Sequence, residues 1–311
     1  MIKCLETFGR VTLNASLKEL NTYRIGGITK YLVVPNSAQS TLELIKYLRE
    51  ENVEYKVFGN GSNMIVGSKL FDGVVIKLSS LNQIEVDSHL KTVEVGAGVM
   101  LPQLAYKVLE YGLVGFEWAS GIPGTVGGSI VGNAGAYNTE IFDMVINVTI
   151  LDEIGEIVKL NVNDIAHSYR HSEFQERDIV VLSVLFQLED GDIEEAKELI
   201  NFRKFKRIES QPLEYPSAGS VFRNPSEEEL EEAYENYDLK GPFAGHLIEE
   251  CGLKGKIING AQISEKHANF IVNYNNATSE DVKELIDLAS LEVEKKFNCK
   301  LNTEQEFFNW D

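Results

Sequence analysis

The chain is organised around the stretch GFEWASGIPGTVGGSIVGNAGAYN, residues 115–138. Its glycines stand at positions 115, 121, 124, 127, 128, 132 and 135, and almost no side chain after Trp118 is large. Because glycine loses the most backbone entropy on ordering, a fold keeps such a segment where backbone must approach something closely. Successive N–H groups of a glycine-rich loop bind anions, which favours a phosphate-bearing ligand. The alternative is a glycine-rich packing crossover without a ligand.

Upstream of this stretch, the pattern predicts a β–α–β–loop order that is typical of nucleotide binding. A short apolar strand at Tyr31–Val34 is followed by a helix that Asn36 or Ser37 caps. The chain returns as a strand at Tyr55–Phe58 and runs into the small-residue loop Gly59–Asn63. On spacing alone this loop is a weak signal, but it strengthens the reading of the glycine-rich stretch.

Short motifs narrow the class of protein. G-x-G occurs at residues 59–61 and 96–98, yet neither copy has the third glycine of the dinucleotide fingerprint. No nucleophile elbow and no P-loop are present. His167 and His171 have H-x3-H spacing without further ligands, so a loop histidine pair is favoured over zinc and no metal is expected.

The order of the remaining elements predicts an α+β fold with three domains. Strands are expected at 74–78, 84–86, 93–95, 145–151, 156–160 and 178–188, and a helix is expected at 101–109. These strands favour a second, mainly antiparallel subdomain after the first β–α–β unit. The expected boundaries are residues 1–74, 75–190 and 191–311.

The last of these domains is expected to begin with a helix at Asp192–Glu209 that is basic at its far end. That end is either a solvated face or a pocket wall for a diphosphate, and the sequence leaves both readings open. Residues 226–235 predict an acidic surface helix with Ser226 and Glu229 as a capping box. A long amphipathic helix is expected at about 279–297.

Composition excludes several function classes. A formal net charge of −19 argues against a nucleic-acid partner or an anionic membrane surface. Cys4, Cys251 and Cys299 show no CxxC pairing, which favours reduced thiols and a cytoplasmic location. No signal peptide and no long apolar run are visible in the sequence.

Five motifs together resemble the UDP-N-acetylenolpyruvoylglucosamine reductase (UDP-N-acetylmuramate dehydrogenase) family. They are the glycine-rich stretch, Gly59–Asn63, YRHSEF at 169–174, YPSAGSVFRNP at 215–225 and HANFIVN at 267–273. The similarity runs from about Asn21 to Glu304, and the form PSAGSVF resembles the shorter of the two family types. As a set the motifs are highly specific.

The resemblance implies a two-subdomain FAD-binding region of the vanillyl-alcohol-oxidase-like (PCMH-type) class and a C-terminal α+β substrate-binding domain. NADPH reduces a non-covalently bound FAD, and UDP-N-acetylglucosamine enolpyruvate then enters the same pocket and takes hydride from flavin N5. The product, UDP-N-acetylmuramate, is a peptidoglycan precursor. No membrane and no nucleic acid take part, and a monomer is expected. By this resemblance the residues that contact FAD are Asn60, Gly61, Ser62, Asn63, Met64, Ala119, Gly121, Ile122, Pro123, Gly124, Thr125, Gly127, Gly128, Gly132, Ala134 and Gly135.

Three residues match the family's catalytic positions. Hydride addition builds negative charge that spreads into the carboxylate, and Arg170 matches the arginine that stabilises it. Ser220 matches the proton donor, although a serine hydroxyl is a poor acid unless the carbanion it meets is strongly basic. Glu304 matches a carboxylate that orients the arginine or, if protonated, relays a proton. Without the resemblance these would read as a surface arginine, a turn serine and an exposed glutamate.

Substrate contacts and departures from the family complete the prediction. Asn224, Arg223 (a lysine in most of the family), Lys204 and Lys254 are the candidates for the uridine and diphosphate end. Asn259 stands where a glycine is usual. Gln305 and Glu306 replace the usual valine and basic residue after Glu304.

Two other function classes stay open at this point. One is a different oxidoreductase on the same flavin scaffold, acting on an alcohol or hydroxy acid. The other is a flavin or nucleotide-sugar binder without activity. Consumption of NADPH that depends on the enolpyruvyl substrate distinguishes both from the family reaction.

Overall fold

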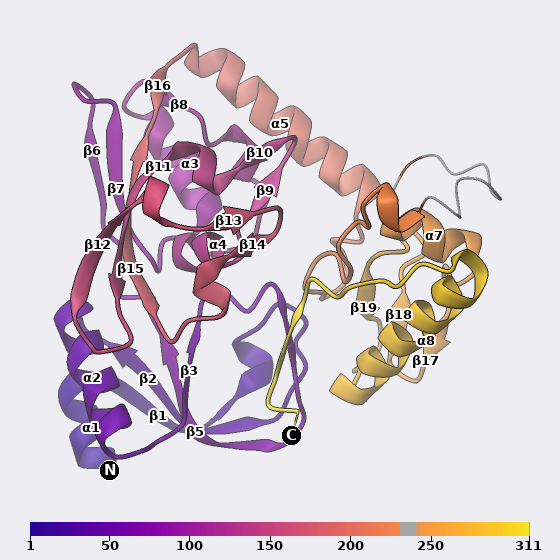
Figure 1. The fold of residues 1–311 in the computed structure, drawn as a ribbon, viewed down its shortest axis with the longest axis horizontal. Helices are drawn as coiled ribbons and strands as arrows, with labels where there is room; N and C mark the ends of the chain where they lie inside the picture. The colour runs from indigo at the N-terminus through magenta and orange to yellow at the C-terminus, as the bar shows by residue number, and fades with distance from the viewer. Residues whose placement is uncertain (231–240, 242, 311) are drawn as a thin grey trace. The chain divides into compact units, whose positions relative to one another are not determined.

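The computed structural model describes residues 1–230, 241 and 243–310, which form two compact units. Unit 1 comprises Met1–Ala15, Thr29–Asn60 and Asp72–Arg207. Unit 2 comprises Ser16–Ile28, Gly61–Phe71 and, from Ile208 onward, the C-terminal part of the chain. Figure 1 shows the elements of both, and each unit is described here by itself.

The first sheet of unit 1 has four strands in the order β1-β2-β5-β3. They are β1 (Gly9–Ser16), β2 (Ile28–Pro35), β5 (Leu70–Lys77) and β3 (Tyr55–Phe58), and β3 runs parallel to β5. Helix α2 (Ala38–Glu50) connects β2 to β3. The Ser37 hydroxyl accepts a hydrogen bond from the Ser40 N–H at 3.1 Å, so Ser37 is the cap. The predicted β–α–β–loop order is confirmed.

The second sheet of unit 1 is antiparallel throughout, as predicted. Its order is β12-β11-β15-β7-β6. The strands are β6 (Ile84–Asp87), β7 (Thr92–Gly96), β11 (Val145–Leu151), β12 (Ile157–Asn161) and β15 (Val180–Gln187). Strand β15 is buried almost along its whole length because it is central in the sheet.

One hydrophobic core runs through both sheets of unit 1. It contains Leu44 of α2, Val74 of β5 and Val184 of β15. The expected domain boundary between residues 74 and 75 falls inside β5, and the boundaries remain a proposal. The other elements of this unit are α1 (Ile2–Phe8), α3 (Leu101–Leu109), β8 (Leu113–Val114), the 3-10 helix η2 (Glu117–Ala119), α4 (Val126–Val131), β9 (Gly135–Ala136), β10 (Thr139–Glu140), η3 (Ile141–Met144), η4 (Val162–Asp164), β13 (His167–Ser168), β14 (His171–Ser172), η5 (Glu173–Gln175), β16 (Glu189–Asp190) and most of α5 (Ile193–Ser210).

Unit 2 packs a small antiparallel sheet, β17-β18-β19, against helix α8. Its elements are η1 (Leu17–Glu19), β4 (Met64–Val66), η6 (Glu228–Leu230), α7 (Ala244–Glu250), β17 (Ile257–Ile258), β18 (Ala261–Ile263), β19 (Ile271–Asn273), α8 (Ser279–Phe297) and β20 (Glu306–Phe308). Thr278 and Asp281 form a capping box at the start of α8. Strand β20 runs parallel to β4 and brings the C-terminal segment beside residues 64–66.

The acidic segment at residues 226–235 is only partly described. The predicted capping box is confirmed: the Ser226 N–H donates to Glu229 Oε2 at 2.7 Å, and the Glu229 N–H donates to Ser226 Oγ at 3.2 Å. Residues 231–235 of the expected helix lie outside the described part of the chain.

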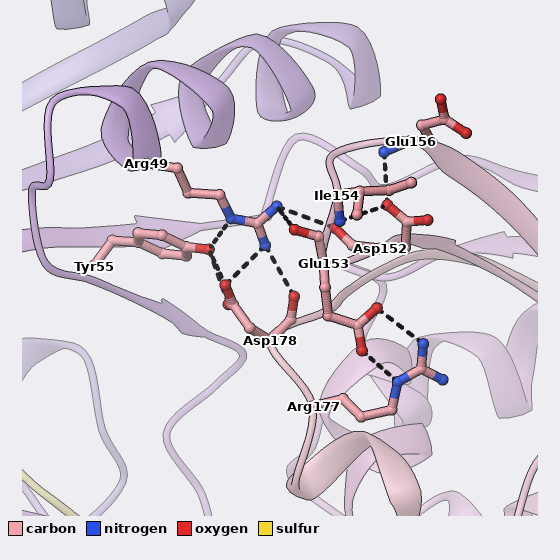
Figure 2. A network of polar contacts seen from close by, with 8 residues as sticks. All are labelled: Arg49, Tyr55, Asp152, Glu153, Ile154, Glu156, Arg177 and Asp178. Carbon is pink, nitrogen blue, oxygen red and sulfur yellow. Dashed lines mark hydrogen bonds and ion pairs between the residues drawn. The ribbon is translucent and has the colours of Figure 1, made fainter.

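A polar network centred on Arg49 ties α2 to the second sheet of unit 1 (Figure 2). The Arg49 guanidinium donates to the carbonyls of Asp152 at 3.1 Å, Glu153 at 3.0 Å and Asp178 at 2.9 Å. It also donates to the Asp178 carboxylate at 2.9 Å and to the Tyr55 hydroxyl at 3.1 Å. Burial, and then the hydrogen bond to Asp178, raises the pKa of Tyr55 to about 12. One arginine therefore links a helix, a hairpin and a loop that are far apart in the sequence.

Arg49→Ala is expected to lower the free energy of unfolding by about 2–3 kcal/mol. The substitution leaves several carbonyls and the Asp178 carboxylate without their charged donor, and hydrogen bonds to charged groups contribute about 1.5–3 kcal/mol. Urea unfolding measures the change. The control is Lys30→Ala, which removes an exposed ion pair with Asp72 and should cost no more than about 1 kcal/mol. Equal losses in the two variants would contradict the network's role.

Candidate active site

The glycine-rich stretch forms a short helix whose start is held by neighbouring loops of unit 1. Helix α4 is capped by Thr125, whose Oγ1 accepts a hydrogen bond from the Gly128 N–H at 3.3 Å. The Val126 N–H donates to the carbonyl of Val99 at 2.8 Å, and the Gly127 N–H donates to the carbonyl of Ala97 at 2.9 Å. The backbone of the stretch is therefore fixed before any ligand arrives.

Some of these glycines are required by packing within the protein. A Cβ at Gly127 would lie 2.9 Å from the Ala97 side chain, and one at Gly135 would lie 2.6 Å from the Thr139 carbonyl oxygen. A Cβ at Gly59 would lie 2.6 Å from Thr125 Oγ1. Since real Cβ atoms do not approach so closely, these positions follow the packing alternative that the sequence left open.

At other glycines a Cβ would make only ordinary van der Waals contacts. A Cβ built at Gly128 or Gly132 would meet no atom closer than 3.4 Å or 3.6 Å, respectively, so packing does not demand glycine there. In the same stretch Trp118 Nε1 and Asn133 Oδ1 are buried and have no hydrogen-bond partner among the described residues. Open backbone together with unpartnered buried polar atoms fits a ligand such as FAD.

The loop at residues 59–63 lies against the glycine-rich stretch through its first two residues. Asn60 Nδ2 donates to the carbonyl of Pro123 at 2.7 Å. Lys77, at the end of β5, donates to the carbonyl of Gly59 at 2.6 Å, and burial lowers its pKa. The sequence analysis missed Lys77, although it is the one charged residue in the apolar run Val74–Leu78.

The other residues of that loop belong to unit 2. Gly61 has φ of +61°, and a Cβ there would lie 2.5 Å from the Leu20 carbonyl oxygen. Asn63 Nδ2 donates to the Glu304 carbonyl at 3.0 Å, and the Asn63 carbonyl accepts from the Glu306 N–H at 2.9 Å. The candidate FAD residues Asn63 and Met64 are thus held by the C-terminal segment that carries Glu304.

Arg170 lies in the two-residue turn between β13 and β14 of unit 1. Its φ is +57°, a left-handed conformation that is uncommon for arginine. Its guanidinium donates to the carbonyl of Gly135 at 2.7 Å and approaches the carbonyl of Asn133 at 3.5 Å. The buried Asn133 amide also donates to the carbonyl of Ser168, at 2.8 Å, and so supports the turn. The structure therefore brings Arg170 to the glycine-rich stretch.

Ser220 and Glu304 lie together in unit 2, on two segments that the sequence places far apart. The Glu304 N–H donates to the carbonyl of Val221 at 2.8 Å, and Phe222 and Thr303 form an antiparallel bridge beside it. Asn269, from HANFIVN, holds the other side: its carbonyl accepts from the Val221 N–H at 2.8 Å. Both candidate side chains are half-buried.

Of the four candidate substrate residues, Lys204 belongs to unit 1 and the other three belong to unit 2. Asn224 Oδ1 accepts from the Ala244 N–H at 3.1 Å and so holds the start of α7. Lys254 pairs with Glu249 at 2.9 Å, and this hydrogen bond lowers the pKa of Glu249. Arg223 is half-buried, and its Nε has no partner among the described residues. Lys204 is exposed on α5 of unit 1.

The basic end of α5 places two arginines, Arg203 and Arg207, near the glycine-rich stretch of the same unit. The Cδ atom of Arg207 would lie 2.6 Å from a Cβ at Gly121, and burial lowers the pKa of Arg207. The guanidinium carbon of Arg203 lies 4.6 Å from the ring centre of Tyr137. The basic run Lys204–Arg207, from which Lys204 is the named candidate, therefore includes one arginine beside the stretch.

The histidine pair has contacts that do not involve a metal. His167 stacks on Phe142 with ring centres 4.3 Å apart, and His171 Nε2 lies 3.1 Å from Glu176 Oε1. Among the described residues, no group of three or more His, Cys, Asp or Glu side chains could hold a metal ion. The three cysteines are free thiols, as predicted. No described helix has the length and apolar character that a membrane span requires.

Two family profiles match the chain. One is described as "FAD binding domain" and covers residues 29–161; the other is described as "UDP-N-acetylenolpyruvoylglucosamine reductase, C-terminal domain" and covers residues 211–308. The first covers most strands of the two sheets of unit 1, without β1 and β15, and the second lies within unit 2.

Proteins with the name of the second profile are similar to this chain over nearly their whole length. A UDP-N-acetylenolpyruvoylglucosamine reductase from Caldanaerobacter subterraneus subsp. tengcongensis is 43% identical over 95% of this chain and 93% of its own. One from Caldicellulosiruptor bescii is 42% identical over 94% and 88%. The crystal structure of the reductase from Thermus caldophilus matches with a TM-score of 0.76 and 29% identity, over 96% of this chain and 98% of its own.

Proposed function

The chain belongs to the UDP-N-acetylenolpyruvoylglucosamine reductase family, and from that premise we propose that it reduces UDP-N-acetylglucosamine enolpyruvate to UDP-N-acetylmuramate with hydride from NADPH. It is an FAD-dependent oxidoreductase of the α+β class, with a PCMH-type FAD-binding region and the family's C-terminal domain. NADPH and the enolpyruvyl substrate use one pocket in turn, in a monomeric cytoplasmic enzyme that supplies peptidoglycan synthesis.

The observation that carries this proposal is that the backbone segments of Ser220 and Glu304 are hydrogen-bonded to each other. The two residues come from separate motifs, and one hydrogen bond from the Glu304 N–H to the carbonyl of Val221 sets their segments side by side. A hydroxyl and a carboxylate on adjacent backbone can share the delivery of one proton. This arrangement supports protonation of a carbanion, a step that an alcohol oxidase does not need.

The residues that would hold FAD are the open glycines of the stretch, with Asn60 and Thr125 fixing the loops around them. When bound, FAD supplies the hydride carrier that no side chain of the chain can provide. The backbone positions left open at Gly128 and Gly132 allow close approach of the cofactor. The first two residues of the loop, Gly59 and Asn60, therefore lie against the stretch within unit 1 and support its backbone there.

Arg170 supplies fixed positive charge for the substrate's carboxylate. Its guanidinium is oriented by the carbonyls of Gly135 and Asn133, so the cation needs little reorganisation when negative charge develops. Ser220 donates the proton at the carbon next to the carboxylate, and Glu304, if protonated, hydrogen-bonds the enolate and relays a proton. Arg223, Asn224, Lys204 and Lys254 remain our proposed contacts to the nucleotide diphosphate.

The purified protein is expected to be yellow, with FAD that acid or heat releases intact. The reason is that residues 115–138 contain neither a histidine nor a cysteine that could tether a flavin. Absorbance near the flavin bands and chromatography of the released cofactor measure this. A colourless protein that does not take up added FAD would contradict the proposal, and FMN in its place would refute the pyrophosphate argument.

The proposed reaction is tested by NADPH oxidation with and without UDP-N-acetylglucosamine enolpyruvate. Oxidation that depends on this substrate, with UDP-N-acetylmuramate as product, is the expected result. Turnover of an alcohol or hydroxy acid in its place would support the other oxidoreductase class. Ligand binding without NADPH consumption would support the non-catalytic binder.

A further inference from the structure

The side chain of Gln305 is buried against the turn that carries Ser220. Its exposed fraction is 3%, and its amide nitrogen lies 3.1 Å from the carbonyl oxygens of Ala218 and Gly219 and 3.3 Å from that of Ser220. All of these atoms belong to unit 2. A single amide therefore donates into three consecutive carbonyls of the segment that holds the candidate proton donor.

The turn depends on these hydrogen bonds because packing does little to hold its centre. Gly219 has φ of +80°, and a Cβ built there would meet no atom within 4 Å. Ala218 is 2% exposed, so its carbonyl has little access to water. A buried carbonyl without a donor is unfavourable, so a turn that lacks these hydrogen bonds would adopt other conformations.

The backbone of Gln305 is itself held on both sides. The preceding residue donates its N–H to the carbonyl of Val221, and the following residue donates to the carbonyl of Asn63 at 2.9 Å. Gln305 also neighbours Tyr23, whose hydroxyl is buried: burial raises the pKa of Tyr23, and Gln305 opposes the rise. The amide is thus presented to the turn from a fixed position beside a neutral phenol.

We propose that Gln305 is a positioning residue for the reaction, which fixes the Ala218–Ser220 turn so that the Ser220 hydroxyl stays where the proton is delivered. This inference rests on the proposed function of Ser220. The resemblance noted in the sequence predicts valine at this position, and valine has no donor to offer the three carbonyls. The departure noted in the sequence is therefore a feature by which this chain supports its own turn.

Gln305→Met keeps the length of the side chain and removes the donor. The reduction of the bound flavin by NADPH should stay within about twofold of wild type, because it needs no proton from Ser220. Its reoxidation by the enolpyruvyl substrate should slow about 10–100-fold, the scale expected for a reacting group displaced by about 1 Å. Anaerobic stopped-flow absorbance separates the two steps. Hydrogen–deuterium exchange should show faster exchange of the backbone at residues 216–222.

Gln305→Glu adds a signature that a merely structural role would not produce. A carboxylate would repel the three carbonyls, whereas a protonated carboxylic acid can still donate to one of them. Burial beside carbonyls raises the pKa of such a group above its usual value of about 4.3. In Gln305→Glu we expect the rate of flavin reoxidation to fall as pH rises through the pKa of the new carboxyl group. This pH step should be absent from flavin reduction in the same variant, and from both steps in wild type and in Gln305→Met.

The matched control is Gln187→Met on the exposed end of β15. The Gln187 amide also donates to three carbonyls, those of Leu90, Lys91 and Leu188, at 3.0–3.2 Å. This variant should change neither half-reaction. Provided that the wild-type protein is active, two results would overturn the inference. One is flavin reoxidation in Gln305→Met at the wild-type rate, and the other is an equal slowing of both steps. A wild type that does not turn over the substrate would refute the proposed function, and the positioning role would fall with it.

Discussion

Ser220→Ala is expected to bind FAD and to be reduced by NADPH at close to the wild-type rate, but to reoxidise very slowly with the enolpyruvyl substrate. The first step transfers hydride only, whereas the second must also quench a carbanion with a proton. Removing the hydroxyl removes the group proposed to donate that proton. The effect should therefore be confined to one of two steps that share a pocket.

The expected loss in the second step is at least about 10²–10⁴-fold, the range that general acid catalysis contributes. Stopped-flow absorbance of the flavin under anaerobic conditions measures each step separately. Ser217→Ala is the matched control, because it removes a hydroxyl from the same PSAGS segment without a proposed role. It should leave both steps unchanged.

Two outcomes would count against Ser220 as the donor. If both steps slow together, Ser220 positions the flavin or the pocket. If neither slows, another group delivers the proton, and Glu304 is the next to test because its segment is hydrogen-bonded to Val221.

Local pattern was sufficient to predict most elements of the fold. The strand Tyr55–Phe58 and the helix Ser279–Phe297 have the predicted bounds, and the hairpin on either side of Asp152–Gly155 is present. In each case the signal is periodic or is a turn residue, so neighbouring residues determine the outcome. Ser37 and the Ser226–Glu229 capping box were predictable for the same reason.

The glycine-rich stretch shows where such reasoning ends. Composition indicates that the backbone makes a close approach at the glycines, but it does not say whether the neighbouring group belongs to the protein or to a ligand. At Gly127 and Gly135 the neighbour is the protein itself, whereas Gly128 and Gly132 are open. Only the three-dimensional path of the chain separates these cases.

Contacts between distant segments were the other part that the sequence could not supply. Lys77 contacts Gly59 because β5 pairs with β3. Arg207 contacts Gly121 because the end of α5 lies beside the glycine-rich stretch. The motif around Arg170 identified the residue but not its left-handed turn. Gln305 was visible as a departure from the family, yet its three carbonyl contacts depend on folding of residues 218–220 against the C-terminal segment.

Arg170→Ala is expected to lower the rate of flavin reoxidation by the enolpyruvyl substrate about 10²–10³-fold, with flavin reduction by NADPH close to wild type. Loss of one preorganised group that stabilises developing negative charge has effects of this size. Arg170→Lys keeps the charge but loses the planar two-point hold on the carbonyls of Gly135 and Asn133, so it should fall between wild type and alanine. The same anaerobic stopped-flow measurement applies.

The left-handed backbone at Arg170 calls for a control that separates strain from chemistry. Lys91→Ala replaces another half-buried cation in a left-handed turn, with φ of +54°, paired with Asp190 and distant in sequence from the site, and it should change neither step. If Arg170→Lys matches wild type, charge alone suffices and the orientation by the two carbonyls has no catalytic role. If Arg170→Ala slows both steps equally while FAD content falls, the arginine supports the glycine-rich stretch that binds the cofactor. A loss confined to reoxidation, graded from lysine to alanine, is the result that a fixed cation facing the substrate's carboxylate requires.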